Sequence, residues 1–538
     1  MAGGTSQTAD CDVLVIGGGI NGCGIARDLS GRGWRVLLCE QDDLASHTSS
    51  ASTKLIHGGL RYLEHREFSL VRKALQEREV LLRSAPHIMW PLRFVMPHDP
   101  AMRPAWMIRA GLFLYDHLAR REVLPGSCTV DLRQHPAGMP LKPAFRKGFV
   151  YSDGWVDDAR LVVLNALDAQ ARGAQILTRT RCTSAQRDAS GWNATLQSAD
   201  GAVRRVRARA LVNAAGPWAA SFLSEQARPA NGERLATRKL RLVKGSHIVV
   251  KRLFEHEHAY IFQSPDKRII FAIPYQGEFT LIGTTDVEWH GEGPVRIDEN
   301  EIRYLCEQAS RYFEKAVRPA DVVWTYAGVR PLLDDEAGDP SAVTRDYLLE
   351  QDTKAAPLLS VWGGKITTFR KLAEDAADAL GAMLGEPREA WTAGTFLAGG
   401  ELAGEASSPA QAGMPQPRFE RFLAELQRQH PWLPAMLARR LAQAYGGRVA
   451  RVLGAARCLA ELGEEVAPGL YERELRYLRE QEWAVTGEDV LWRRSKLGLR
   501  LSEAQRERVN RWMAQEATHD AVRPRPLHRA QARDLAER

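Results

Sequence analysis

The stretch from Asp12 to Glu40 constrains the fold more than any other part of the chain. It opens with an apolar, β-branched run, DVLVI, continues through the glycine-rich turn GGGINGCG, and closes with a second apolar run, WRVLLCE. A helical stretch that extends to about Gly31 separates the two runs. A strand, a glycine turn, a helix and a second strand make a βαβ unit, so the sequence predicts a Rossmann-like α/β domain.

Three glycines in this turn, Gly17, Gly19 and Gly22, form the pattern G-x-G-x-x-G. Gly17 allows the tight turn, Gly19 lets the backbone approach a pyrophosphate, and Gly22 lets the helix pack closely on the strand. The free N–H groups at the helix N-terminus then face the phosphates. Glu40, at the end of the second strand, is placed to accept hydrogen bonds from ribose hydroxyls. A 2′-phosphate would be repelled there, which argues against NADP.

Two later segments favour FAD over NAD as the dinucleotide. A permanently held FAD needs further contacts along its ribityl and isoalloxazine parts. LVNAAGPWA (211–219) is an apolar strand that ends in small residues, and VWGGKITTFRKLAE (361–374) is a strand, a glycine turn and a helix start. Gly363 and Gly364 would open a helix whose N–H groups could meet the flavin pyrimidine edge, where reduction places negative charge.

The composition indicates a large globular protein in a reducing compartment. A chain of 538 residues with 44% hydrophobic content can bury cores in about two to four domains. Its seven cysteines are scattered and form no C-x-x-C pair, which supports neither a disulfide framework nor a zinc site, so we expect no metal. The net charge of +7 suits an anionic substrate, an anionic membrane surface or nucleic acid, and selects none of them.

Neither a signal peptide nor a spanning helix is expected. The N-terminus MAGGTSQTAD lacks a basic region and an apolar core, and the chain offers no long uninterrupted apolar window. The stretch PAWMIRAGLFLYDHLARR (104–121) mixes large apolar residues with arginines. It is typical either of a helix that lies on a membrane surface or of a core helix with a basic rim.

A series of motifs across residues 12–380 closely resembles, in its order, the aerobic FAD-dependent glycerol-3-phosphate dehydrogenases. The motifs are GGGINGCGIARDLSGRG, TSSASTKLIHGGLRYLE, YSDGWVDDARLV, NAAGPWA, KGSHIVV, IGTTDVE, WTYAGVRPL, TRDY and GGKITTFRKLAE. Further on, LYERELRYLREQEW and LWRRSKLGLRL resemble the family's helical C-terminal domain. A small departure is Phe369, where several relatives carry tyrosine.

The resemblance implies oxidation of sn-glycerol 3-phosphate to dihydroxyacetone phosphate, with electrons passing through FAD to a membrane quinone. It also implies a cytoplasmic protein attached peripherally to the anionic inner face of the cytoplasmic membrane, and it leaves a homodimer open. An oxidase that passes the electrons to oxygen is an alternative, and so is an FAD-dependent amine or amino-acid oxidase, which would need fewer phosphate-binding arginines. A nucleic-acid binder is disfavoured, because interleaved aromatic residues and any known nucleic-acid module are missing.

Such a substrate needs cations for its phosphate, and arginine grips phosphate oxygens in pairs. Arg61, Arg330 and Arg345 lie in short loop-like stretches and could converge on the phosphate. Tyr62 could donate to the phosphate or to the substrate oxygen, or it could be a buried tyrosine with one satisfied hydroxyl.

The alcohol proton must also leave, and a histidine with a pKa near neutral could accept it. His57 and His247 are the two candidates, and His57 also belongs to the expected substrate contacts. Lys365 could stabilise charge at the flavin edge or hold the substrate oxygen. His247, for which the resemblance adds support, Arg330 and Lys365 are expected to be the catalytic residues.

The stretch STKLIHGGLRYLE (52–64) is interpreted as a loop with two functions. Its early residues would serve the cofactor and its late residues the substrate, with Gly58 and Gly59 turning the backbone between them. The expected cofactor contacts of the whole chain are Gly17, Gly18, Gly19, Asn21, Gly22, Glu40, Ser50, Thr53, Lys54, Leu55, Ala215, Gly216, Gly363, Gly364, Lys365, Thr367 and Thr368.

The expected architecture is α/β with α+β parts. An FAD-binding domain over residues 1–385 would contain an interleaved substrate domain at roughly 90–150 and 240–325, with antiparallel strands over 259–263, 268–275 and 279–283. A linker at 386–417 would lead to a helical domain at 418–520, in which Thr486 and Ser502 begin capping-box sequences. The arginine-rich end, 521–538, is expected to be disordered.

Overall fold

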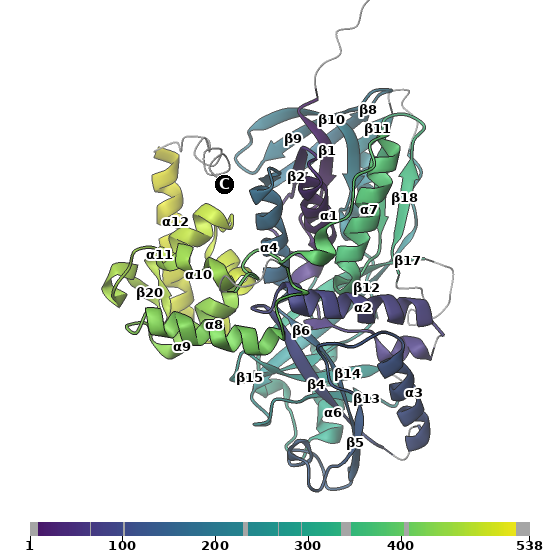
Figure 1. Cartoon of the computed structure of the whole chain (residues 1–538), viewed down its shortest axis with the longest axis vertical. Helices are drawn as coiled ribbons and strands as arrows, with labels where there is room; N and C mark the ends of the chain where they lie inside the picture. The colour runs from purple at the N-terminus through teal and green to yellow at the C-terminus, as the bar shows by residue number, and fades with distance from the viewer. Residues whose placement is uncertain are drawn as a thin grey trace, which may run out of the picture.

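A computed structural model describes residues 9–522, apart from 65, 100–102, 230–234, 267, 292, 335–345 and 403–407. Figure 1 shows three parts: an α/β unit at the top of the view, a second sheet below it, and a group of helices to the left. The predicted combination of a Rossmann-like domain, an inserted antiparallel sheet and a C-terminal helical domain is confirmed. The expected tail lies almost entirely outside the described residues.

The α/β unit is built on a parallel sheet that carries the glycine-rich turn. Its parallel strands have the order β7, β2, β1, β10, β19. Their bounds are β1 Cys11–Ile16, β2 Val36–Cys39, β7 Gln175–Leu177, β10 Val203–Asn213 and β19 Leu358–Trp362. Every residue of β1 is buried, as expected for an apolar run between two parallel neighbours.

Antiparallel strands extend this sheet on the side of the long strand β10 that faces away from β1. They are β8 Thr180–Arg187, β9 Trp192–Ser198 and β18 Leu348–Asp352, while the short β11 Ala227–Pro229 runs parallel to β8. The short helix α5 Ala219–Ser221 follows β10. Since β10 pairs with β1, β9 and β19, it joins the beginning, middle and late parts of the chain into one sheet.

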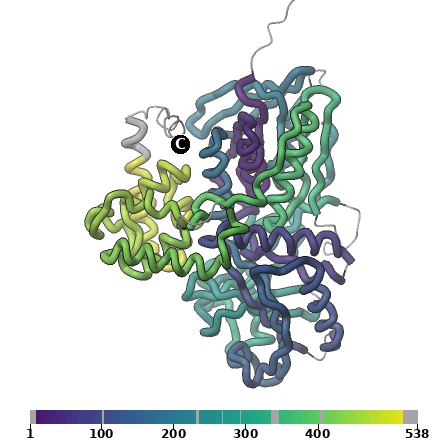
Figure 2. Tube along the Cα trace, in the orientation of Figure 1, coloured from purple at the N-terminus to yellow at the C-terminus, as the bar shows by residue number. Residues whose placement is uncertain are grey.

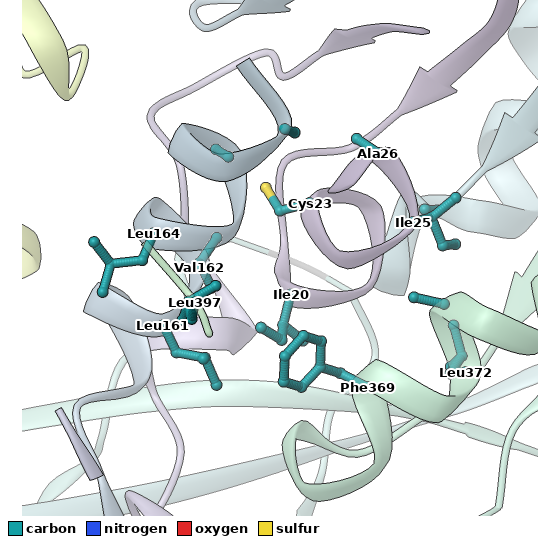
Figure 3. Close-up of a cluster of buried hydrophobic side chains, with 14 of the residues drawn as sticks. Ile20, Cys23, Ile25, Ala26, Leu161, Val162, Leu164, Phe369, Leu372 and Leu397 are labelled. Carbon is teal, nitrogen blue, oxygen red and sulfur yellow. The ribbon is translucent and has the colours of Figure 1, made fainter. Parts of the chain in front are cut away.

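Three helices bury their apolar sides in one core beside the parallel sheet: α1 Ile20–Gly31, α4 Asp158–Ala171 and α7 Phe369–Met383. Figure 2 shows α1 and α7 running side by side although they come from opposite ends of the α/β unit's sequence. In Figure 3 the Phe369 ring lies beside Ile20 of α1. A Cβ on Gly24 would lie 2.9 Å from the Phe369 ring, so glycine at this position allows the two helices to pack closely.

The second sheet has the order β16, β12, β15, β14, β13, β4, β6, β3, and in addition β17 pairs with β12 and β5 with β6. The three strands predicted at its centre are confirmed, with antiparallel pairing, as β13, β14 and β15. The bounds are β3 Leu55–Ile56, β4 Met89–Pro97, β5 Cys128–Asp131, β6 Lys147–Val156, β12 Leu240–Lys251, β13 Ala259–Gln263, β14 Ile269–Tyr275, β15 Phe279–Gly283, β16 Val287–Glu288 and β17 Val322–Leu333.

Helices cover both faces of the second sheet. Helix α6 Glu299–Tyr312 packs on one face, and α2 Phe68–Ser84 and α3 Ala105–His117 contribute to the core on the other. In the part of the chain that is described, no helix combines the length and the apolar character that crossing a membrane requires.

The C-terminal part is mostly helical and has its own core. Its helices are α8 Pro415–Gln429, α9 Ala435–Tyr445, α10 Val449–Leu453, α11 Glu472–Gln481 and α12 Glu503–Val522, joined by a small hairpin of β20 Glu465–Ala467 and β21 Leu470–Tyr471. Both predicted capping boxes form. The Asp489 N–H donates to Thr486 Oγ1 at 3.2 Å, and the Gln505 N–H donates to Ser502 Oγ at 3.3 Å. The first of them opens a π-helical turn, Asp489–Arg494.

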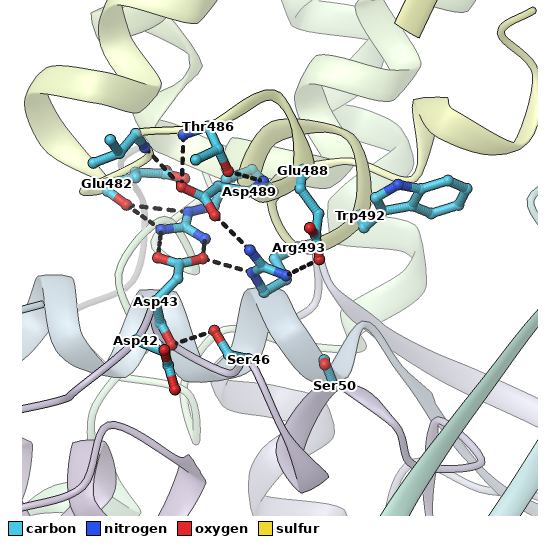
Figure 4. A network of polar contacts seen from close by, with 12 residues as sticks. Asp42, Asp43, Ser46, Ser50, Glu482, Thr486, Glu488, Asp489, Trp492 and Arg493 are labelled. Atoms are coloured by element: carbon cyan, nitrogen blue, oxygen red, sulfur yellow. Dashed lines mark hydrogen bonds and ion pairs between the residues drawn. The ribbon is translucent and has the colours of Figure 1, made fainter. Parts of the chain in front are cut away.

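Buried ion pairs join this helical part to the α/β unit (Figure 4). Both oxygens of Asp43, which lies in the loop after β2, accept from the Arg494 guanidinium at 2.6 and 2.7 Å. Arg493 also donates to Asp43 at 2.6 Å, and Arg179 donates to Asp489 at 2.8 Å. The π-helical turn is thereby fixed against the loop that leads from β2 toward the candidate site.

Candidate active site

The glycine-rich turn forms one wall of a cavity of about 380 Å³ at the carboxyl end of β1. Gly17 has φ +110°, and a Cβ on Gly22 would lie 1.9 Å from the Gly17 carbonyl oxygen, so this close approach of turn and helix excludes a larger residue. The Ile20 N–H at the start of α1 donates to Ser49 Oγ at 3.0 Å. Ser49 lines the cavity but was not among the residues expected from the sequence.

Glu40 lies in the same cavity at the end of β2. One carboxylate oxygen accepts the Gly18 N–H at 2.6 Å and the other accepts the Asp42 N–H at 2.9 Å. Burial raises the pKa of Glu40, and the two backbone hydrogen bonds oppose that shift. Ala215 and Gly216, after β10, also line the cavity. The arrangement places a fixed carboxylate where a ribose hydroxyl could donate to it.

One group of metal-ligand side chains is found in the described residues, formed by Glu40, Asp42 and His47. Their ligand atoms lie within 4.8 Å of one another. The Glu40 oxygens are already bonded to backbone N–H groups, and His47 Nε2 lies 2.9 Å from the Asp42 carboxylate. The hydrogen bonds of this group therefore account for its geometry without an ion.

A second cavity of about 310 Å³ adjoins the first. Gly363 and Gly364, which follow β19, line both cavities, and so do Ile20, Thr48, Ser49 and Pro331. Asn21 Nδ2 donates to the Gly363 carbonyl at 3.2 Å, which ties the first turn to the late glycine pair. Together the two cavities extend from the glycine-rich turn to the second sheet, and they offer space for an elongated cofactor and a further small molecule.

Besides the glycine pair, this second cavity is lined both by residues expected at the cofactor and by residues expected at the substrate. They are Thr53, Leu55, His57, Arg61, Tyr62, His247, Arg330, Lys365 and Thr367. They come from strands β3, β12 and β17 of the second sheet and from loops and short helical turns, which explains why their sequence positions are so far apart. Arg345 lies outside the described residues.

Arg330, on β17, is held in the cavity wall by a short ion pair. Its Nη1 donates to Asp286 Oδ1 at 2.5 Å, and its Nη2 donates to the Thr285 carbonyl at 3.1 Å. A Cβ on Gly245 would lie 2.2 Å from Nη2, so the glycine makes room for the guanidinium. Asp286 lines the cavity and was missed by the sequence analysis, although it stands in the motif IGTTDVE.

His247, on β12, is a buried and neutral histidine at the cavity wall. Its ring stacks on Tyr326 with centroids 4.7 Å apart, and Nε2 lies 3.0 Å from Thr53 Oγ1. Burial, followed by the charges of Lys54 and Arg330, lowers its pKa well below 6.5. The imidazole therefore carries a lone pair at neutral pH and can accept a proton.

The remaining expected groups, Lys365, Tyr62 and His57, also line this cavity. The ammonium of Lys365 lies 3.7 Å from the centre of the Tyr62 ring, a cation–π contact. The His57 N–H donates to Thr367 Oγ1 at 3.2 Å, and the His57 ring meets the edge of Phe271. The cations Arg61, Arg330 and Lys365 thus converge from three separate segments.

Several expected cofactor contacts do not line either cavity. Lys54 is buried, and its ammonium donates to Asp158 at 2.8 Å and to the Ser50 carbonyl at 3.1 Å, so it braces the loop from behind. Ser50 Oγ donates to the His47 carbonyl, and Thr368 is buried at the start of α7. Gly18 and Gly22 support the turn from behind its cavity-facing residues. These residues support the loops that form the wall, and their direct contact with a cofactor stays a prediction.

Family models and curated relatives match most of the chain. Residues 12–370 match the family model described as FAD dependent oxidoreductase, and residues 390–523 match the C-terminal domain of alpha-glycerophosphate oxidase. A glycerol-3-phosphate dehydrogenase of Pseudomonas aeruginosa is 52% identical, with 96% of both chains covered. A D-erythritol 1-phosphate dehydrogenase of Brucella abortus is 49% identical, covering 94% of this chain and 98% of that one.

A solved structure shows the same arrangement. The glycerol-3-phosphate dehydrogenase from Bacillus halodurans, complexed with FAD, superposes with a TM-score of 0.74 at 30% identity. The match covers 94% of this chain and 91% of that one. The similarity therefore includes both sheets and the helical C-terminal part.

Proposed function

The chain belongs to the family of FAD-dependent oxidoreductases, and on that premise we propose that it oxidises sn-glycerol 3-phosphate to dihydroxyacetone phosphate and passes the electrons to a membrane quinone. The observation that carries the proposal is the convergence of Arg61, Arg330 and Lys365 with a neutral His247 in one cavity beside the dinucleotide turn. Three cations suit a phosphate ester, and a neutral imidazole suits an alcohol that must lose a proton.

FAD is the cofactor, and the residues of the two cavities fit it. The glycine-rich turn lets backbone approach a pyrophosphate, the N-terminus of α1 faces that point, and Glu40 offers a carboxylate for the ribose. Gly363 and Gly364, before α7, would border the isoalloxazine end, where both have positive φ. When bound, FAD supplies a two-electron acceptor for the hydride of the alcohol carbon.

Of the two candidate arginines that the structure describes, Arg61 is the more available for the phosphate. Glu64, Asp286 and Asp346 also line the second cavity, but each lies near a cation of its own, at Arg103, Arg330 and Lys73. Within the described residues, the Arg61 side chain makes neither a hydrogen bond nor an ion pair. An arriving phosphate would therefore find in Arg61 a charge that no carboxylate of the described residues pairs with.

A longer sugar-alcohol phosphate is a second candidate substrate, because the relative from Brucella abortus carries the name of a D-erythritol 1-phosphate dehydrogenase. Both compounds combine a phosphate with hydroxyl groups. The lining of the second cavity also includes Met96, Tyr151, Ile261, Phe271 and Gln263. Of these, Gln263 is the one whose amide could bond an additional hydroxyl, so a comparison of the two substrates tests how much of the wall is used.

Helix α3 supports attachment to a membrane and therefore a quinone as the acceptor. Trp106, Met107, Phe113 and Leu114 are exposed, and their spacing places them on one face, while Ile108 and Leu112 are buried on the other. This helix packs against the turn Leu60–Leu63, which forms part of the second cavity. An apolar face laid on a bilayer would thus hold the cavity close to a lipid-dissolved quinone.

The test of the proposed function is an anaerobic absorbance spectrum before and after addition of sn-glycerol 3-phosphate, with glycerol and D-erythritol 1-phosphate in parallel. We expect the flavin band to bleach with the glycerol ester and to persist with glycerol, because glycerol has no phosphate for the arginines. Bleaching only by the erythritol ester would move the assignment to the longer substrate. A band that no phosphate ester bleaches would refute the proposal. Reoxidation by a soluble quinone under nitrogen, compared with reoxidation by oxygen, then distinguishes a dehydrogenase from an oxidase.

A further inference from the structure

Among the described residues, the hydrogen-bond partner of the His247 imidazole is Thr53, which lies in the loop before β3. Thr53 Oγ1 lies 3.0 Å from His247 Nε2. The other ring nitrogen, Nδ1, is buried and has no hydrogen-bond partner among the described residues. His247 is 2% exposed and is one of the residues that line the second cavity, where a substrate would lie.

The loop that carries Thr53 is held rigidly from behind. Asp158, which is 0% exposed, accepts from the Ser52 hydroxyl at 2.7 Å and from the Lys54 ammonium at 2.8 Å. Lys54 adopts a left-handed conformation, with φ 60°. The hydroxyl of Tyr326, whose ring stacks on His247, donates to the Ser52 carbonyl at 2.8 Å. The same short loop therefore fixes the hydrogen-bond partner of the imidazole and one of the rings that flank it.

This arrangement determines which nitrogen can act as the base. A neutral imidazole has one N–H and one lone pair, so the nitrogen that donates to Thr53 cannot accept the substrate proton. If Nε2 carries the hydrogen and donates to Thr53 Oγ1, the lone pair lies on Nδ1. In the opposite tautomer, the buried N–H at Nδ1 would have no acceptor. An unpaired buried N–H is less favourable than an unpaired buried lone pair, so the tautomer with the hydrogen on Nε2 is preferred.

We propose, on the basis of the proposed function, that Thr53 is a positioning residue that accepts the His247 Nε2–H and thereby presents the Nδ1 lone pair to the substrate hydroxyl. In the step, the substrate O–H bond breaks and an N–H bond forms at Nδ1. The carbonyl forms as the C–H electron pair leaves as hydride to the oxidant that FAD supplies. Thr53 acts through His247 and touches neither the phosphate nor the reacting carbon.

The experiment is a double-mutant cycle of Thr53→Val and His247→Ala in the FAD-loaded enzyme. The rate of flavin reduction and the dissociation constant of sn-glycerol 3-phosphate come from stopped-flow absorbance, and FAD content comes from the spectrum. Thr53→Val is expected to slow reduction at least tenfold while substrate affinity and FAD content stay at the wild-type values. In the His247→Ala background, the same change should have no further effect, because the base that Thr53 orients is gone. Thr53→Ser, which keeps the hydroxyl, should restore most of the rate.

Two controls separate this proposal from its alternatives. Thr183→Val makes the same substitution at an exposed strand residue outside both cavities and should leave all three quantities unchanged. Equal slowing by Thr53→Val in both backgrounds would show a merely structural role, and loss of FAD would show a cofactor contact instead. An unchanged rate in Thr53→Val would overturn the proposal as well. Failure of the wild-type enzyme to bleach with any phosphate ester would refute the proposed function itself.

Discussion

Arg61 and Arg330 line the same cavity but differ in how the protein holds them. Arg330 is paired with Asp286, whereas the Arg61 guanidinium has no side-chain partner in the part of the chain that is described. Arg61→Gln should therefore weaken binding of sn-glycerol 3-phosphate without affecting folding. Losing a charge-assisted contact to phosphate removes about 1.5–3 kcal/mol, which is roughly a tenfold to hundredfold rise in the dissociation constant.

A substrate titration of flavin reduction gives the dissociation constant, and a melting experiment gives the thermal midpoint of unfolding. Arg120→Gln is the matched control, because its side chain is 87% exposed and lies outside the cavity. An unchanged dissociation constant for Arg61→Gln would remove Arg61 from the phosphate site. A lowered thermal midpoint would show that Arg61 has a structural role.

The burial of His87 predicts that the folded protein loses stability at acidic pH. The residue is fully buried in the folded protein, and burial lowers its pKa to about 3. In the unfolded chain the ring titrates near its ordinary value of about 6.5. As the pH falls below 6.5, the unfolded state takes up the proton first, so the folded state loses stability, by about 2 kcal/mol at pH 5.

His87→Gln, which cannot titrate, should make the unfolding midpoint less sensitive to pH between 6.5 and 5. His430→Gln is the control, because His430 is only partly buried and lies in the helical part. Midpoints measured by circular dichroism at both pH values give the comparison. Equal losses of stability in wild type and His87→Gln would show that His87 does not contribute.

At the residue scale, residue types and the family resemblance predicted residues that the structure brings together, while their contacts with ligands stay a prediction. His247, Arg330 and Lys365 do line one cavity, as their residue types and the family resemblance suggested. Lys54 was expected at the cofactor, and the structure instead pairs it with Asp158, which is 104 positions away. Asp286 was missed because a carboxylate next to a phosphate site makes sense only once its pairing with Arg330 is seen.

At the scale of elements, local signals were reliable and long-range pairing was not. The βαβ start, the three central strands of the second sheet and the capping boxes at Thr486 and Ser502 depend on neighbouring residues, and all of them form. The second sheet joins β3, β4 and β6 to later strands through β4 and β13, whose paired residues Phe94 and Ala259 are 165 positions apart. Such pairing depends on tertiary packing, which hydrophobic periodicity does not encode.

The junction between the π-helical turn and the loop after β2 gives an element-scale prediction. Asp43 is 2% exposed and binds both Arg493 and Arg494. Asp43→Asn should lower the thermal midpoint clearly, because breaking a buried ion pair leaves an uncompensated charge and costs about 3–5 kcal/mol. Glu488→Gln is the control, since Glu488 also pairs with Arg493 but its side chain is 71% exposed.

Differential scanning calorimetry of the FAD-loaded proteins measures both variants. The helical part has its own core, so weakening of the junction should show as a separate, earlier transition in Asp43→Asn. If Asp43→Asn and Glu488→Gln melted alike, the buried pair would contribute no more to the junction than an exposed one.

At the scale of the whole molecule, helix α3 is the proposed surface of attachment to a bilayer. Trp106 is 71% exposed and Phe113 is 57% exposed, and burying one such side chain in the interface contributes about 1.5–3 kcal/mol. Trp106→Ser with Phe113→Ser should therefore release the protein from anionic vesicles, as measured by flotation at low salt. Met436→Ser is the control, because Met436 is 76% exposed but lies on α9.

The same variants test the link between attachment and the electron acceptor. Oxidation of sn-glycerol 3-phosphate with a quinone dissolved in the vesicles should fall at least tenfold in the α3 double variant, because the cavity would no longer be held at the bilayer. Turnover with a water-soluble dye should stay at the wild-type rate, since α3 contributes no residue that lines the cavity. Equal quinone activity in the double variant, Met436→Ser and wild type would show that α3 is not the attachment surface, and equal loss with dye and quinone would show damage to the site itself.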